Sequence, residues 1–265
     1  MPKMAANLTM LWPELEPYDR FRAAAAAGFR HVEMLFPQEL DVARVQRLLQ
    51  ELDLNMVLFD PSPGDWASGE RGLLSLPGRE EEFLATVEEA VGVATRLGTR
   101  RLNALVGIPP AETPNEVAEL TALDNLRRVV DYVGNAGCVL LVEAVNNTDM
   151  PGYWAGTTER SARLVQSVDH PALRLQLDQY HAAMAGEDAI ASFHRWHTLI
   201  AHVQIADSPG RHQPGTGGQP IGRFLAELDR LRYDGFVGLE YKPLGPTAES
   251  LAWMQELHAP DVPHA

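Results

Sequence analysis

Short apolar runs alternate with longer amphipathic segments along almost the whole chain, and this alternation constrains the fold more than any other feature. Eight apolar runs have the length of a strand, at residues 4–11, 29–36, 55–60, 101–107, 139–143, 173–178, 200–206 and 236–240. Helical patterns follow them, at residues 17–27, 41–52, 80–98, 114–137, 157–168 and 187–197, with two more that end near residues 232 and 257. Such alternation is typical of parallel strands joined by right-handed helical crossovers.

The number of these units indicates the architecture. Eight strand–helix units in a chain of 265 residues match a (β/α)8 TIM barrel, an α/β fold. An open, doubly wound sheet is the alternative, but no glycine-rich phosphate-binding fingerprint follows the first run. Because no linker or change of composition divides the chain, we predict a single TIM-barrel domain over residues 1–265, with a short tail from about residue 258.

The chain is strongly acidic, with a formal net charge of -14. A surface of this charge repels phosphate backbones and anionic lipids, which argues against nucleic acid and membranes as partners. No apolar stretch approaches the roughly 18 residues of a membrane-spanning helix, and the first residues lack the pattern of a secretory signal. The single cysteine, Cys138, cannot form an intramolecular disulfide. These features favour a cytoplasmic protein, and the sequence leaves open whether it forms a homo-oligomer.

Polar side chains lie at or near the ends of four consecutive runs in the second half of the chain. Glu143 directly follows four apolar residues, and Asp178, Gln204 and Glu240 lie in the next three runs. Since side chains alternate between the two faces of a strand, these four share the face opposite the apolar residues that contact the helices. Active sites of such barrels lie at the carboxyl ends of the strands. We therefore expect the four side chains to converge at the mouth of the barrel.

Converging carboxylates repel one another, so they require protons or a cation. Three carboxylates and an amide oxygen form a hard, all-oxygen donor set, which favours Mg²⁺ or Mn²⁺. The sequence offers no suitable thiolate and no clear histidine trio for a structural zinc. It therefore predicts a divalent metal held by Glu143, Asp178, Gln204 and Glu240.

Three further residues are candidates for substrate binding. His181 follows the sixth run, Arg211 lies in a glycine- and proline-rich loop, and Lys242 follows the eighth run on its inward face. Positively charged side chains over the mouth of the barrel would attract and bind an anionic group of a substrate. Each side chain also has an ordinary structural interpretation, as a surface residue or as a salt-bridge partner. His202, which lies deeper in the seventh run, is more typical of a satisfied core histidine.

Other polar residues and two long loops border the same face. Glu33 lies near the end of the second run, and its side chain is expected to point into the barrel. Asn7 and Asn103 lie within buried runs, where they need hydrogen-bond partners and would line the floor of the pocket. Residues 61–79 and 207–219 form loops with the length of lids or binding loops. The charged and aromatic residues of the first loop would either close over a ligand or form a structural network.

Two glutamates beside a divalent metal suggest a reaction. Glu143 and Glu240 come from strands three apart in an eight-membered ring, so they would flank the pocket. A metal between them can hold a carbonyl and the adjacent hydroxyl and stabilise the enediolate that forms when a proton leaves carbon. One glutamate would remove that proton and the other would return it. This predicts an aldose–ketose isomerase or an epimerase. Phosphoester hydrolysis and a barrel that binds without turnover are the alternatives.

Several short segments, spread over nearly the whole chain, form a recognisable set. They are residues 5–10 (AANLTM), 32–37 (VEMLFP), 63–65 (PGD), 76–80 (LPGRE), 141–144 (LVEA), 177–181 (LDQYH), 202–206 (HVQIA), 214–217 (PGTG) and 238–243 (GLEYKP). Each is weak alone, but together and in this order they are specific. By this set the chain resembles the hydroxypyruvate isomerase family, within the xylose-isomerase-like TIM barrels.

The resemblance implies the interconversion of hydroxypyruvate and tartronate semialdehyde. It also implies that Glu143 and Glu240 are the acid/base pair, and that these two residues, Asp178 and Gln204 surround a divalent metal. Ketose 3-epimerases of the superfamily are similar at the same strand ends and hold substrate with a His and an Arg near His181 and Arg211. They usually carry His at the position of Gln204, which favours the isomerase.

Three positions depart from the pattern of the resembled family. Gly218 stands where the family commonly has Glu, Asp60 where it often has Asn, and Gln213 where it often has Glu. These positions border the expected pocket. A longer 2-oxo acid, such as a 2-oxo-tetronate, is therefore an alternative substrate.

Overall fold

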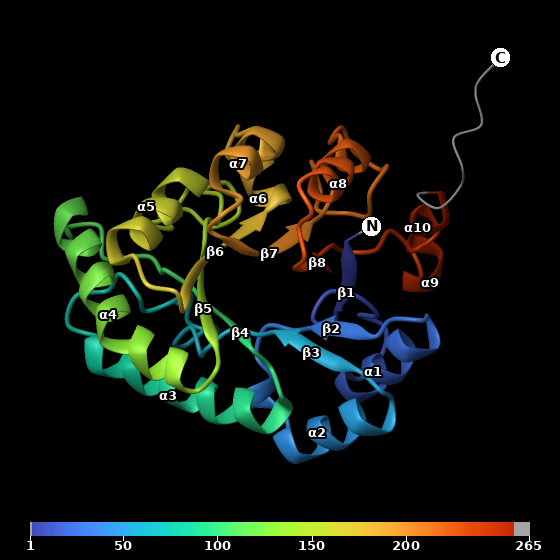
Figure 1. Cartoon of the computed structure of the whole chain (residues 1–265), viewed down its shortest axis with the longest axis horizontal. Coiled ribbons are helices and arrows are strands. Elements are labelled where there is room, and N and C mark those ends of the chain that lie inside the picture. Colours follow the sequence, from blue (N-terminus) through green and yellow to red (C-terminus); the bar gives the residue numbers. More distant parts are fainter. Residues whose placement is uncertain (1, 257–265) are drawn as a thin grey trace.

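The predicted strands form a ring of eight parallel strands in the computed structural model, which describes residues 2–256 (Figure 1). They are β1 (Lys3–Asn7), β2 (His31–Glu33), β3 (Asn55–Leu58), β4 (Arg101–Ala104), β5 (Val139–Glu143), β6 (Leu173–Asp178), β7 (Ile200–Ile205) and β8 (Phe236–Leu239). The sheet order is β3-β2-β1-β8-β7-β6-β5-β4. A parallel bridge between Phe59 and Leu102 joins the two edges, and the Asn103 amide donates to the Phe59 carbonyl at 3.0 Å. The predicted (β/α)8 barrel is confirmed.

Helices surround the ring of strands on the outside (Figure 1). They are α1 (Pro17–Ala26), the 3-10 helix η1 (Pro37–Glu39), α2 (Val42–Glu51), α3 (Glu80–Leu97), α4 (Asn115–Asn135), α5 (Thr158–Val168), α6 (Gln179–Met184), α7 (Ala189–Trp196), α8 (Ile221–Arg230), α9 (Thr247–Ser250) and α10 (Trp253–Glu256). Asp41 caps α2 and Thr157 caps α5 through their side chains, and Gly98 ends α3 with a φ of 73°. Among the described residues, no helix is long and apolar enough to cross a membrane.

Two apolar cores lie on the two sides of the strands. The larger core fills the space between strands and helices and contains Leu140 and Val142 of β5. The smaller core lies inside the ring and includes Ala5, Val57, Leu58 and Leu141. Leu141 therefore points inward while its neighbours point outward, as side-chain alternation predicts. Glu143 shares the inward face of Leu141, so a polar layer begins where the apolar interior ends.

Several elements differ from the prediction. β1 and β4 end earlier than predicted, at Asn7 and Ala104. β2 is shorter, because its register with β3 shifts between Val32 and Glu33 and the chain then enters η1. Helix α6 occupies the predicted loop after β6, and its six residues are too few for a periodic pattern. The predicted last helix is divided into α9 and α10. Its predicted end at residue 257, and the tail from about residue 258, lie outside the described residues.

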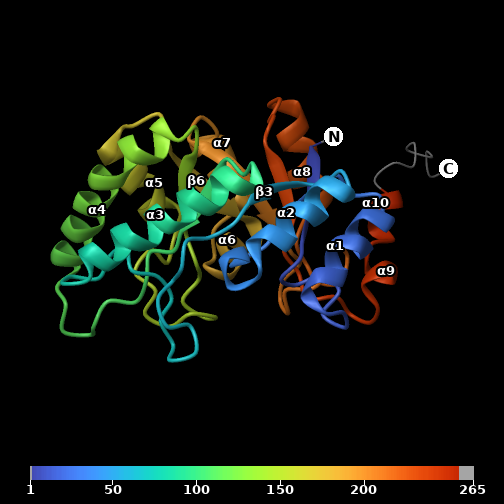
Figure 2. The same ribbon diagram turned by 90° about the horizontal axis from the view of Figure 1, so that it is seen from below.

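Loops that follow the strands extend from one end of the barrel. In Figure 2 the loop of residues 61–79, coloured cyan, projects below the strands, on the same side as the yellow-green loop that follows β5. All strands are parallel, so their carboxyl ends open toward this side. The polar side chains at the strand ends are therefore brought to a common mouth.

Candidate active site

Three carboxyl groups meet at the carboxyl ends of the strands. Glu143 ends β5, Asp178 ends β6, and Glu240 directly follows β8. All three residues are buried, with exposed fractions of 5%, 3% and 5%. Glu143, Asp178 and His181 each offer one possible ligand atom, and these atoms lie within 4.8 Å of one another. The structure thus brings these strand ends together at one point.

Among the described residues, Arg211 is the cation that forms ion pairs with these carboxylates. Its Nη2 donates to Asp178 Oδ2 at 3.1 Å and to Glu240 Oε2 at 2.7 Å. Its guanidinium also lies 5.0 Å from the centroid of the Tyr180 ring. A buried carboxylate is costly without such a partner, so Arg211 offsets part of the repulsion between Asp178 and Glu240.

Asp207 holds the loop that carries Arg211. Its side chain is buried and accepts hydrogen bonds from four backbone amides. At 2.8–3.0 Å these come from Ser208 and Gln219 to Oδ1 and from Gly215 and Gly217 to Oδ2. Because the four amides lie at both ends of the loop, one carboxylate fixes its path, and charge-assisted bonds of this kind are among the strongest in proteins.

A second polar group lies inside the ring around Glu33. Glu33 Oε1 accepts from Asn7 Nδ2 at 3.0 Å and from Gln204 Nε2 at 2.8 Å. Its Oε2 is bonded to His202 Nε2 at 2.7 Å. The carboxyl group occupies the space that a side chain at position 238 would need, which Gly238 leaves free. His202 is thus a buried core histidine with a partner, and Asn7 is paired as its buried position requires.

Burial controls the acidity of the three carboxyl groups at the mouth. Burial, and to a lesser extent the charge of Asp178, raises the pKa of Glu143 to about 8. Hydrogen bonds from Gln176 and Asn103 oppose this shift, because they stabilise the ionised form. The side-chain Nδ2 of Asn103 donates to Glu143 Oε2 at 2.9 Å. Burial also raises the pKa of Asp178, and it raises the pKa of Glu240 well above its ordinary value, while Arg211 opposes both shifts. The group therefore tends to hold protons unless a further cation lies nearby.

Asn146, which is not among the predicted site residues, contacts the His181 ring. Asn146 Nδ2 lies 2.7 Å from His181 Nδ1, and His181 Nε2 lies 3.6 Å from Asp178 Oδ2. Burial and then the charge of Arg211 hold the pKa of His181 well below its usual value, so the ring is neutral. The available sequence signal was the run of turn-forming residues 146–149 directly after β5.

Comparison with known proteins identifies the family. Residues 21–257 match the xylose isomerase-like TIM barrel family. The chain belongs to this family. The 2-oxo-tetronate isomerase of Cupriavidus necator is 38% identical over 255 residues, which cover 96% of this chain and 98% of that protein. The hydroxypyruvate isomerase of Escherichia coli is 37% identical over 254 residues, again 96% of this chain and 98% of that protein. The predicted resemblance is confirmed.

A solved structure is similar over the same length. It is named as an AP endonuclease, family 2, from Brucella melitensis, and it is 38% identical with a TM-score of 0.94, covering 97% of this chain and 99% of that chain. A D-psicose 3-epimerase from Clostridium cellulolyticum, at 16% identity and a TM-score of 0.77, shares the fold.

The donor set of this xylose isomerase-like barrel suits a divalent cation. Three buried carboxyl groups face one guanidinium, so when all three are ionised, two negative charges remain for a further cation to neutralise. Carboxylate oxygens are the donors that hard cations prefer. The buried group of Glu143, Asp178 and His181 is therefore a place where a metal could bind.

Gln204, the predicted fourth ligand, lies next to Asp178 in the strand register. Its amide already has two partners, since Nε2 donates to Glu33 and Oε1 accepts from Gln176 Nε2 at 2.7 Å. An amide oxygen has two lone pairs, so one remains on Oε1. Gln204 thus fits a ligand role, and that role stays a prediction.

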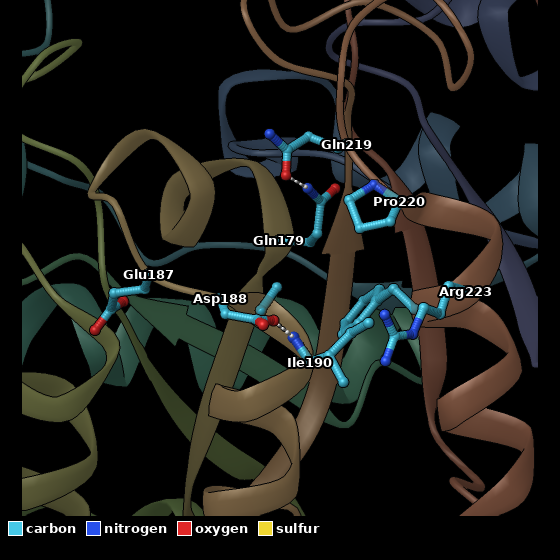
Figure 3. A pocket seen from close by; sticks show the side chains of 9 residues that line it. Gln179, Glu187, Asp188, Ile190, Gln219, Pro220 and Arg223 are labelled. Atoms are coloured by element: carbon cyan, nitrogen blue, oxygen red, sulfur yellow. Dashed lines mark hydrogen bonds between the residues drawn. The ribbon is translucent and has the colours of Figure 1, made fainter.

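Two cavities lie near these residues. One of about 10 Å³, enough for about one water molecule, lies among the polar strand ends and is lined by Glu33, Asp60, Glu143 and Glu240 among others. A larger one of about 250 Å³ is lined by residues of α6, α7 and the start of α8 (Figure 3). In this larger cavity Asp188 caps α7 and Glu187 accepts from Thr158. Its carboxylates therefore have structural partners, whereas the smaller cavity contains the buried carboxyl groups at the strand ends.

Lys242 is placed differently from the other candidates. Its side chain is exposed. Its backbone N–H donates to the Arg211 carbonyl at 2.7 Å, and its carbonyl is bonded to His212 Nδ1 at 2.8 Å. Lys242 therefore supports the Arg211 loop through its backbone, and contact between its ammonium group and a substrate stays a prediction.

The loop of residues 61–79 is held by its own contacts. Arg79 pairs with Glu70 at 2.6 Å and also with Glu82. Glu70 accepts from the Asp65 amide at 2.6 Å. The Arg71 guanidinium lies 3.9 Å from the centroid of the Trp66 ring. Of the two interpretations of this loop, these contacts favour the structural network.

Proposed function

We propose that this chain is an isomerase that interconverts hydroxypyruvate and tartronate semialdehyde. The observation that carries the proposal is a pair of buried glutamates, Glu143 and Glu240, that line one cavity at the carboxyl ends of β5 and β8. A pKa of about 8 for Glu143 suits a group that takes and gives protons near neutral pH. The names of the two bacterial relatives support the same reaction class.

The proton transfers follow from the chemistry of the substrate. Hydroxypyruvate carries a hydroxymethyl group next to its ketone. The ionised glutamate removes a proton from the hydroxymethyl carbon, which forms an enediolate, and the protonated glutamate delivers a proton to the former ketone carbon. The hydroxyl proton moves to the former ketone oxygen, so atoms balance and no redox partner is consumed. Mutual repulsion in a buried site favours one ionised and one protonated carboxyl group, as these steps require.

We propose that Glu143, Asp178, Gln204 and Glu240 hold a divalent metal, with Mg²⁺ or Mn²⁺ suited to these oxygen donors. When bound, the ion would supply a Lewis acid that stabilises negative charge on the substrate oxygens. The excess of three buried carboxyl groups over one guanidinium supports this assignment.

Arg211, His181 and Lys242 are the proposed substrate-binding residues. Arg211 contacts Asp178 and Glu240, and the substrate carboxylate would take over one of these contacts, because a guanidinium–carboxylate pair is strong where little water competes. His181 borders the same carboxylates from α6. Lys242 would act from the rim, where its exposed ammonium attracts the anion.

A longer 2-oxo acid is the second candidate substrate, because the Cupriavidus necator relative is a 2-oxo-tetronate isomerase. The same residues would catalyse the same steps on it. Phosphoester hydrolysis, to which the name of the Brucella melitensis structure points, fits less well. A net charge of -14 and three buried carboxylates repel a phosphodiester.

A substrate panel followed by deuterium exchange tests the proposal. The protein, with Mg²⁺ or Mn²⁺, is given hydroxypyruvate, 2-oxo-tetronate, a free ketose and DNA with an abasic site. We expect turnover of a 2-oxo acid, with exchange of its carbon-bound proton in D₂O. Turnover of the ketose alone would favour an epimerase, and cleavage of the DNA would favour hydrolysis.

Two substitutions test the acid/base pair. Glu143→Gln and Glu240→Gln should each reduce turnover and exchange by about 10²- to 10⁴-fold, the range of general acid–base catalysis. Glu88→Gln, at an exposed position of α3, is the matched control and should keep wild-type rates. Wild-type turnover in either site variant would refute the assignment.

The cellular setting belongs to the same proposal. The single cysteine and the net charge of -14 support a cytoplasmic enzyme of small-molecule metabolism, without nucleic acid or membrane as a partner. Gel filtration at several concentrations would measure whether it forms a homo-oligomer.

A further inference from the structure

The orientation of the Asn146 side chain is determined by partners of fixed polarity. Its Oδ1 accepts from the backbone amides of Thr148 at 3.0 Å and Asp149 at 2.9 Å, and a backbone N–H can only donate. Its Nδ2 lies 3.1 Å from Asp149 Oδ2, a carboxylate oxygen that accepts. Exchanging the amide oxygen and nitrogen would oppose like groups in all three contacts. The position of the NH₂ group is therefore known independently of the histidine.

This orientation decides which ring nitrogen of His181 carries the proton. Asn146 Nδ2 lies 2.7 Å from His181 Nδ1, and the Asn146 backbone N–H donates to the same nitrogen at 3.4 Å. Two N–H groups directed at one nitrogen leave no room for a proton of its own, so Nδ1 is the acceptor. In a neutral imidazole the proton is then on Nε2.

We infer that Asn146 is a positioning residue that holds His181 in the Nε2–H tautomer, so that His181 donates a hydrogen bond to the substrate and does not bind the metal. His181 Nε2 lies 3.6 Å from Asp178 Oδ2. A nitrogen that carries a proton has no lone pair for a metal ion. The metal donors among Glu143, Asp178 and His181 are then the two carboxylates. The donation to substrate rests on the proposed function, whereas the tautomer does not.

Burial makes the arrangement stable. Asn146 is 1% exposed and His181 is 4% exposed. The loop after β5 supplies Asn146, and the first turn of α6 supplies His181, so the pair joins two segments that border the site. Turning the ring over, or moving its proton to Nδ1, would leave the buried Asn146 NH₂ facing a carbon or a second N–H. Such an unpaired buried donor costs about 1–3 kcal/mol.

The tautomer can be measured directly. Long-range ¹H–¹⁵N spectra of histidine-labelled protein, recorded without metal or substrate at neutral pH, distinguish protonated from unprotonated ring nitrogens, and the spectrum of His181→Gln identifies the His181 signals. We expect an unprotonated Nδ1 and a protonated Nε2, both retained when Mg²⁺ is added. A protonated Nδ1, or loss of the Nε2 proton on adding Mg²⁺, would overturn the inference.

A pair of substitutions tests the role of Asn146. Asn146→Asp replaces the NH₂ donor by a carboxylate oxygen. Asn147→Asp makes the same change at the neighbouring exposed residue, whose Oδ1 accepts from the Gly152 amide. In Asn146→Asp we expect a proton on Nδ1 and a kcat/KM about 10- to 100-fold lower, as is typical for residues that orient a site residue. Asn147→Asp should keep the wild-type tautomer and rates.

The outcomes separate this inference from the proposed function. An Asn146→Asp protein that folds and retains an unprotonated Nδ1 would overturn the inference, and if that variant does not fold, the wild-type spectra decide. A wild-type protein with the Nε2–H tautomer that turns over no 2-oxo acid would refute the proposed function and leave the tautomer assignment intact.

Discussion

At the scale of single residues, Asp60 adds a further acidic side chain to the cavity that Glu143 and Glu240 line. It is buried. Burial and then the charges of Glu143, Glu240 and Glu33 raise its pKa well above the ordinary value, while a hydrogen bond with Asn103 opposes the shift. A protonated carboxyl group has nearly the shape of an asparagine amide and can also donate. Asp60 in place of the Asn that the resemblance implies here therefore changes the site less than its formal charge suggests.

Asp60→Asn should accordingly leave kcat/KM at neutral pH close to the wild-type value. At alkaline pH the wild-type carboxyl group ionises and adds a negative charge beside the glutamates, so the variant should retain activity to higher pH. Profiles of kcat/KM against pH for hydroxypyruvate and 2-oxo-tetronate measure this difference. A large loss at neutral pH would contradict it and would show that the reaction uses a charged Asp60. Asp60→Ala, which removes one of the two hydrogen-bond partners of the Asn103 side chain, is the contrasting variant and should lose activity.

Gly238 shows how an absent side chain makes room for a charged one. An added Cβ would overlap the Glu33 carboxyl group, which is bonded to His202 and Gln204. Gly238→Ala should lower the free energy of unfolding by about 1–3 kcal/mol, as overpacking in a core does. Gly222→Ala is the matched control, because its Cβ would meet nothing within 4 Å in α8 and alanine favours a helix by about 1 kcal/mol over glycine. Urea unfolding distinguishes them, and equal stability would contradict the overlap.

At the scale of elements, the loop of residues 207–219 depends on the Asp207 carboxylate. Asp207→Asn would place an NH₂ group against backbone N–H groups that now donate to Asp207. We expect the loop to lose its fixed path and Arg211 to lose its position, so the KM for the substrate should rise while the barrel stays folded. Hydrogen exchange of the loop amides, measured together with KM, tests this. Asp124→Asn, at a position 71% exposed, is the control. A protected loop in Asp207→Asn would contradict the role of the carboxylate.

The elements also show how far sequence reasoning reaches. β5 and β6 have the predicted bounds, because a continuous apolar run bounded by a charge is a local signal. The alternation of side chains between the two faces of a strand is also a local property, so the inward direction of Glu143 could be predicted. Pairing of Glu33 with His202 joins residues 169 positions apart, and the Asn146–His181 contact joins the loop after β5 to helix α6. Such contacts depend on which segments the closed ring brings together, and no periodic pattern in the sequence encodes that.

At the scale of the whole molecule, the buried carboxyl groups link stability to pH. The ordinary pKa of a glutamate is 4.5 and that of Glu143 in the fold is about 8. Between these values the unfolded chain has released the proton and the folded protein retains it, so the folded state binds more protons. Stability therefore decreases as pH rises, by at most about 1.4 kcal/mol per pH unit for each such group. The raised pKa values of Asp178 and Glu240 act in the same direction.

In EDTA, the melting temperature should consequently fall as pH rises from about 4.5 to about 8. Mg²⁺ or Mn²⁺ binds the ionised carboxylates of the folded state, so added cation should raise the melting temperature most at the upper end of this range. Glu143→Gln should weaken both effects, because it removes the titrating group and a proposed ligand. Glu88→Gln removes the same unit of charge from an exposed position of α3 and should leave both effects unchanged. This control distinguishes an effect of the buried site from an effect of overall charge repulsion in a chain of net charge -14. A flat melting temperature in EDTA, or equal stabilisation of both variants by the cation, would contradict the titration and the metal assignment, respectively.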